Sequence, residues 1–81
     1  MSERAGRLAG YPAMDQRQTL AKADAGIADA KQCIARQQGL IEKIARSGRD
    51  TRAAEELLAT MHNTLHAMQA HRRTIVTELR I

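Results

Sequence analysis

The chain has 81 residues, a formal net charge of +4 and a hydrophobic content of 43%, which together allow one small domain. Cys33 is the only cysteine, which excludes an internal disulfide and a paired metal–thiolate site. Tyr11 is the only aromatic residue, so the core must be aliphatic. Chains of this size rarely draw more than about 3–5 kcal/mol from one core and usually need a staple or a partner.

The first residues show no helical periodicity. Gly6, Gly10 and Pro12 interrupt residues 1–14, which we expect to form a flexible N-terminal tail, with Met14 as a candidate alternative start. This stretch holds no apolar block long enough for a secretory signal. No apolar run in the chain approaches the ~18–20 residues that a membrane span needs. We therefore expect a cytoplasmic protein without a membrane association.

Residues 15–81 are expected to form one helical domain, with a first helix over about residues 16–46. Asp15 and Gln18 have the spacing of a capping box at its start. Apolar or small residues then recur at alternating intervals of three and four, which predicts a helix seam packed against another helix. The residues of this first seam are Leu20, Ala23, Ile27, Ala30, Ile34, Gln37, Ile41 and Ile44.

A turn over residues 47–50 is expected to separate the first helix from a second, over about residues 51–79. Gly48 can adopt the left-handed conformation that ends a helix, and Asp50 or Thr51 is the expected N-cap of the second helix. The second helix carries the same alternation of threes and fours. The residues of this second seam are Ala54, Leu58, Met61, Leu65, Met68, Arg72, Ile75 and Leu79.

The two seams align when the chain folds back on itself. Pairing Ile44 with Ala54 at the loop end leads to Leu20 with Leu79 at the open end, and the sum of the paired positions stays constant to within one. Small residues then face large ones in several layers, which allows packing without voids. The sequence therefore predicts an all-α, coiled-coil-like, antiparallel two-helix hairpin. We further expect two hairpins to form a four-helix bundle.

One flank of this hairpin is expected to be apolar. Leu40 and Leu57 lie beside the seam near the turn, with Cys33 and Gly26 further along the same side. We interpret this flank as an interaction surface; the alternative is a lone hairpin whose two leucines cover the end of the seam. Cys33 is interpreted as a small buried hydrophobe, with a position at a symmetric dimer interface as the alternative.

Arg72 is the clear exception in the seam pattern. An ion pair with Asp24 or Asp29 on the first helix could satisfy it, or its guanidinium could extend to water while its stem packs. A polar seam residue can also fix register or oligomeric state, and Gln37 could act in the same way. Arg72 is therefore included in the candidate interaction surface.

Arginines surround the turn. Arg46, Arg49 and Arg52 are candidate phosphate contacts, although cations at a solvated helix end are the simpler interpretation. His62 and His66, four residues apart, lie on one helix face and are weak candidate metal ligands. No acidic residue or further cysteine completes a metal site, so neither a metal nor another cofactor is expected.

These features favour a non-enzymatic protein. The sequence lacks a phosphate-binding glycine loop, a pair of catalytic carboxylates and an aromatic nucleic-acid motif. We expect a helical interaction module that forms a homodimer, binds an unidentified protein, or does both through its apolar flank. The alternative is a small basic regulatory protein that contacts nucleic acid through the arginine-rich turn.

Residues 33–76 also carry a resemblance to known sequences. A Leu-Ile pair at residues 40–41 is followed by Gly-Arg-Asp-Thr at 48–51 and by Ala-Glu-Glu-Leu-Leu at 54–58. This arrangement resembles a class of short, uncharacterised helical-hairpin proteins of soil and plant-associated alphaproteobacteria. The resemblance implies a bacterial, cytoplasmic origin and brings no activity or functional residues with it.

Overall fold

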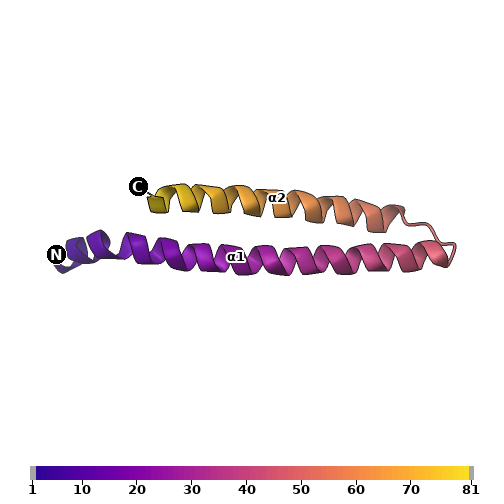
Figure 1. Cartoon of the computed structure of the whole chain (residues 1–81), viewed down its shortest axis with the longest axis horizontal. Helices are drawn as coiled ribbons and strands as arrows, with labels where there is room; N and C mark the ends of the chain where they lie inside the picture. The colour runs from indigo at the N-terminus through magenta and orange to yellow at the C-terminus, as the bar shows by residue number, and fades with distance from the viewer. Residues whose placement is uncertain (1, 81) are drawn as a thin grey trace.

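The structure is a computed structural model that describes the backbone of residues 2–80 and the side chains of residues 16–79. It consists of two α-helices, α1 (Ser2–Arg46) and α2 (Arg52–Arg80), which lie side by side and antiparallel (Figure 1). Together they form a rod 67 Å long and 19 by 16 Å across. The predicted all-α hairpin is therefore confirmed.

The start of α1 differs from the expected one. The helix begins at Ser2, well before residue 16, and its N-terminal part extends past the end of α2 (Figure 1). The expectation rested on Gly6, Gly10 and Pro12, whose cost in a helix is about 1 kcal/mol for glycine and about 3 kcal/mol for proline. The flexibility expected of residues 1–14 stays a prediction, and the side chains of this segment lie outside the described residues.

The end of α1 is closed by backbone hydrogen bonds around Gly48. The N–H of Arg49 donates to the carbonyl of Ile44 at 3.2 Å, and the N–H of Gly48 donates to the carbonyl of Ala45 at 3.0 Å. This pair of bonds is a Schellman motif, which requires a left-handed backbone conformation at the residue just before Arg49. Gly48 has φ 77° and supplies that conformation, as the sequence predicts.

Asp50 and Thr51 share the capping of α2. The Thr51 carbonyl accepts the first helical hydrogen bond, from the N–H of Glu55 at 2.9 Å, which makes Thr51 the N-cap. Its hydroxyl donates to the Glu55 carboxylate at 2.9 Å. The Asp50 carboxylate accepts from the N–H of Arg52 at 2.9 Å. Both residues named by the sequence therefore satisfy groups at this helix end.

The predicted seams form the interface between the helices. Every residue of the two seams is buried or half-buried, which confirms the pattern. The buried apolar side chains in the described part of the chain are Ile27, Ile34, Leu65 and Ile75, and none of them is fully buried. The interface is a single layer deep, so the hairpin has a thin core.

The register of the two helices differs from the predicted pairing. Arg72 pairs with Asp24, three residues before its expected seam partner Ile27, and the Met68 side chain lies over Gly26, four residues before its expected partner Ala30. At the open end, Gln16 Nε2 donates to Glu78 Oε2 at 2.9 Å, and this contact shows a displacement in the same direction. The loop also runs back along α1 before α2 begins (Figure 1). These contacts displace the predicted pairing by three to four residues, or one seam layer, and the bond of Gln37 to Ala54 displaces it by seven from the predicted partner Met61.

Gln37 is a buried polar residue within this interface. Its Nε2 donates to the backbone carbonyl of Ala54 at 2.9 Å, and its side chain is 9% exposed. The bond joins the C-terminal part of α1 to the first turn of α2. A buried amide that lacks a hydrogen-bond partner destabilises the folded state. Gln37 therefore favours the register in which its Nε2 reaches the carbonyl of Ala54.

The loop geometry leads to a paired test of two glycines. Gly48→Ala should destabilise the hairpin by about 1 kcal/mol, because alanine is strained at a left-handed φ. Gly39→Ala should stabilise it by about 0.5–1 kcal/mol, because Gly39 lies inside α1 with no atom within 4 Å of the added Cβ. Urea unfolding followed by far-UV circular dichroism, at one fixed protein concentration, measures both. Equal effects of the two substitutions would contradict the helix end at Gly48.

Candidate interaction surfaces

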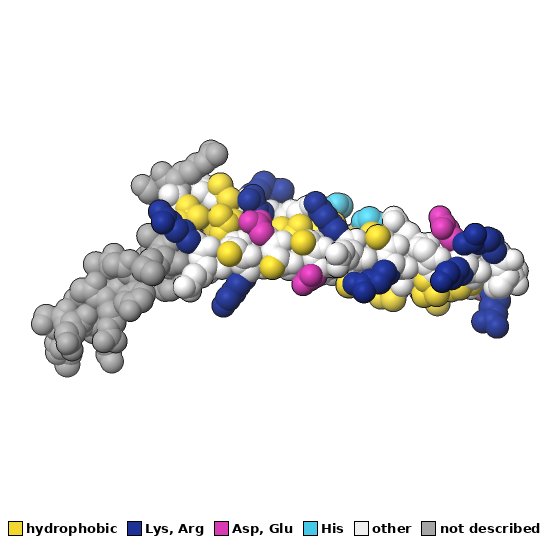
Figure 2. All heavy atoms as spheres, turned by 60° about the horizontal axis from the view of Figure 1, so that its bottom comes forward, with side chains coloured by type: hydrophobic (Ala, Val, Ile, Leu, Met, Phe, Trp, Pro, Cys, Tyr) yellow, Lys and Arg dark blue, Asp and Glu magenta, His cyan; other side chains and the backbone are white. Residues whose placement is uncertain are grey.

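The open flank of the hairpin, defined by Cys33, Leu40, Leu57 and Thr64, is the first candidate surface. Leu40 is 48% exposed and Leu57 is 52% exposed, and they are the exposed large hydrophobic residues in the described part of the chain. Figure 2 shows hydrophobic side chains at the surface toward the loop end of the rod. The structure therefore leaves both leucines of the predicted flank in contact with water.

Cys33 is exposed, so its interpretation as a small buried hydrophobe is wrong. It directly precedes the seam residue Ile34, which turns its side chain away from α2 toward the side of the hairpin. No further helix covers this side within the described residues. The Arg36 guanidinium donates from Nη2 to the sulfur at 3.9 Å.

The outer face of α2, next to the open flank, has the alternating spacing of a further seam. Its residues are all exposed and include no Lys, Arg, Asp or Glu: Ala53, Leu57, Thr60, Thr64, Ala67, His71 and Thr74. The three threonine hydroxyls donate to carbonyls one turn earlier in α2, at 3.0–3.3 Å. Their methyl groups are therefore the parts that remain to contact a neighbour. We name these seven residues the uncharged face.

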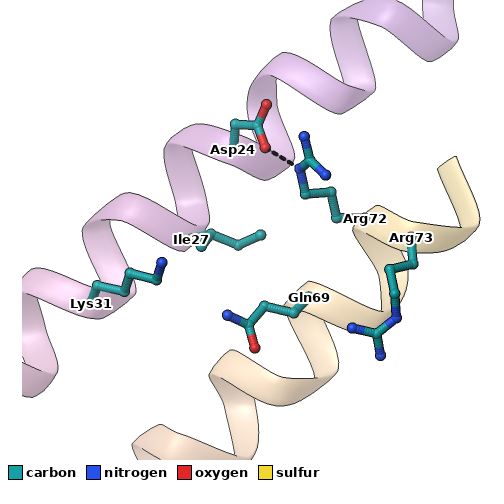
Figure 3. Close-up of a pocket in the computed structure, with 6 residues that line it drawn as sticks. All are labelled: Asp24, Ile27, Lys31, Gln69, Arg72 and Arg73. Atoms are coloured by element: carbon teal, nitrogen blue, oxygen red, sulfur yellow. Dashed lines mark hydrogen bonds and ion pairs between the residues drawn. The ribbon is translucent and has the colours of Figure 1, made fainter. Parts of the chain in front are cut away.

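Arg72 lies at the opposite edge of the interface. Its Nε donates to a carboxylate oxygen of Asp24 across the two helices (Figure 3), which confirms one of the two expected partners. Lys31, Gln69 and Arg73 line the shallow groove beside this pair. The side chains of Arg72 and Asp24 are 41% and 51% exposed, so water and salt screen the ion pair.

The three arginines at the turn lie at one end of the rod. Arg46, Arg49 and Arg52 are all exposed, and Figure 2 shows Lys and Arg side chains gathered at that end. The Arg52 guanidinium lies 3.9 Å from the Asp50 carboxylate, which offsets part of its charge. The surface can contact anions, and its geometry is that of solvated side chains around a helix end.

The two candidate metal ligands do not gain a third. His62 is half-buried and His66 is exposed on α2. Among the described residues, no group of three His, Cys, Asp or Glu side chains is placed to hold a metal ion. The expectation that the protein binds no metal stays a prediction.

Sequence reasoning missed two features of these surfaces. The uncharged face was detectable, because residues 53–74 repeat the same alternation of threes and fours as the seam. The position of Arg36 over Cys33 was not, because the rotamer of a long exposed side chain depends on its surroundings.

No family model, no curated protein and no solved structure matches this chain. The resemblance to alphaproteobacterial hairpin proteins therefore stays a prediction. Within the described part of the chain, neither helix has an apolar stretch that could cross a membrane.

The Arg72–Asp24 pair can be measured by a double-mutant cycle with Asp24→Asn and Arg72→Gln. We expect a coupling free energy of about 0.2–1 kcal/mol at low salt that falls in 1 M NaCl, because both side chains are substantially exposed. Urea unfolding of the four proteins provides the values. The matched control is Asp29→Asn in place of Asp24→Asn, which should give no coupling with Arg72. An equal coupling for Asp29 would contradict the observed register.

Proposed function

We propose that this protein is a non-enzymatic helical interaction module that binds a second copy of itself through the open flank. The observation that carries the proposal is the exposure of Leu40 and Leu57, which lie on the same flank close to the loop. The resulting assembly would be a four-helix bundle, in which each hairpin covers the side that the other leaves open.

The exposed area of the chain supports this proposal. A compact monomer of 9.0 kDa exposes about 4,900 Å², whereas this chain exposes 6495 Å². The excess is about 1,600 Å². In the described part of the chain, most residues outside the two seams are exposed. A stable interface of standard size takes about 800 Å² from each partner, and a hairpin with uncovered faces can offer such an area.

The thin core supports it further. Four apolar side chains are buried in the described part of the chain, and a fully buried Leu or Ile contributes about 1.5–3 kcal/mol. Fixing the backbone costs about 1–2 kcal/mol for each ordered residue. A second apolar surface, covered by a partner, would add the burial that a single layer does not provide.

The distribution of charge favours the open flank over the opposite one. The uncharged face and the two leucines adjoin on one side of the rod. The groove on the other side is lined by Lys31, Arg72, Arg73 and Asp24. Charged groups are depleted at the centres of protein interfaces because their desolvation costs free energy. The open flank and the uncharged face of α2 are therefore the better docking surface, with Lys22, Asp29, Arg36 and Lys43 of α1 at its border.

The proposal is tested by placing charge on the open flank. Leu40→Lys with Leu57→Lys should shift the mass measured by analytical ultracentrifugation from dimer to monomer, because two buried ammonium groups would lack partners. The control adds two lysines at exposed alanines outside the open flank, as Ala45→Lys with Ala59→Lys, and should leave the mass unchanged. A wild-type chain that sediments as a monomer, or a dimer that survives the leucine substitutions, would contradict the proposal.

A second candidate function is nucleic-acid binding through the turn. Arg46, Arg49 and Arg52 are exposed at one end of the rod, and this arrangement favours contact with phosphates. Replacing all three with Gln should then weaken binding to a short duplex at low salt and reduce the slope of log K against log salt by up to about 2.7. Fluorescence anisotropy measures both. The matched control replaces Lys22, Lys31 and Arg36, which lie away from the turn.

A further inference from the structure

We infer that the second copy lies antiparallel on the open flank, related to the first by a two-fold axis that passes beside Cys33. This inference rests on the proposed self-association and specifies its geometry. An axis of this kind makes the interface isologous, so the assembly closes as a dimer and exposes no further copy of the docking surface.

The residues around Cys33 are arranged as such an axis requires. Arg36 lies three residues after Cys33 and Asp29 lies four residues before it, both exposed on the side of α1 next to the open flank. Neither Arg36 nor Asp29 forms an ion pair within the described part of the chain. In an antiparallel pair of α1 helices centred on Cys33, each Arg36 faces the Asp29 of the other copy, twice over by symmetry.

The same axis matches large residues to small ones. Leu40 lies seven residues after Cys33, and Gly26 lies seven residues before it. A Cβ added at Gly26 would lie 2.9 Å from Cε of Met68, so the Met68 methyl group occupies the space beside the glycine and supplies apolar surface at this position. Leu40 of one copy would pack against Gly26 and the Met68 methyl group of the other, which buries apolar surface at both ends of the interface.

In the observed register, the same two-fold axis also brings the α2 helices of the two copies together. Met68 lies over Gly26, and the helices are antiparallel. Cys33, seven residues after Gly26, is therefore level with the stretch around Met61, seven residues before Met68. The axis then lies near the middle of the uncharged face, and Leu57 of one copy faces the segment around Thr64 and Ala67 of the other. These side chains are small and uncharged, which permits close approach of two α2 helices.

Charge decides between the antiparallel and the parallel arrangement. Lys22, Asp29, Arg36 and Lys43 recur every seven residues along α1 and are all exposed. A parallel pair of α1 helices would set each of them against its own copy, giving four contacts between like charges. The antiparallel pair replaces these with two attractive contacts, Arg36 with Asp29, and two repulsive ones, Lys22 with Lys43. The antiparallel arrangement is therefore favoured.

The first experiment uses Cys33 as a proximity probe in the full chain. With oxidised glutathione, two Cys33 thiols lose two protons and two electrons and form a disulfide, while the glutathione disulfide is reduced to two thiols. A disulfide needs Cα atoms about 4.4–6.8 Å apart. Because the proposed axis places the two Cys33 residues beside each other, most of the protein should become a covalent dimer. The matched control, Cys33→Ser with Gln32→Cys, moves the thiol to the adjacent exposed position away from the flank and should stay largely uncrosslinked.

The second experiment tests the orientation of the two α1 helices. The crosslink alone does not, because Cys33 would also approach its copy in a parallel pair. Arg36→Asp and Asp29→Arg, each alone, should raise the dimer Kd about 5- to 30-fold by sedimentation equilibrium, and the double substitution should restore it. A parallel pair predicts no rescue. A dimer without crosslinking at Cys33, or without rescue, overturns the antiparallel arrangement while leaving self-association standing. A wild-type chain that is monomeric at all concentrations overturns both.

Discussion

The contact between the two seams is the interaction on which the rest of this structure depends. Each helix buries one stripe of mostly aliphatic side chains, and the stripes of α1 and α2 cover each other along the hairpin. Since the hairpin has no second layer, this contact has to offset most of the ordering entropy of both helices. In the described part of the chain, most residues outside the seams remain in contact with water, which is why the exposed flanks are the places to look for function.

Two polar groups give this apolar contact a defined register. Gln37 is buried and bonded to the carbonyl of Ala54, and Arg72 is paired with Asp24 at the groove edge. Aliphatic side chains can slide past one another by one layer at little cost, because each new layer again sets apolar residues against apolar residues. A buried amide cannot, because it would lose its acceptor. Gln37 therefore contributes more to specificity than the half-exposed Arg72 does.

The candidate site could be predicted from sequence in part. Leu40 and Leu57 adjoin the seam in the heptad pattern, and both are exposed on one flank as expected. The burial state of Cys33 could not be predicted, because a residue beside the seam is buried only when a third helix lies against it. The threonine hydroxyls of α2 also required the structure, since their bonds to the preceding turn leave mainly methyl groups at the surface.

The sequence by itself determined that two helices form, the residues of each seam, and the helix end at Gly48, because these follow from local spacing and backbone conformation, whereas it placed the start of α1 too late. Only the tertiary structure decided the register. An alternation of threes and fours repeats itself after every layer, so two seams face each other equally well before and after a shift of about three to four residues. Contacts between specific side chains, such as Gln37 with Ala54 and Met68 with Gly26, select one of these arrangements.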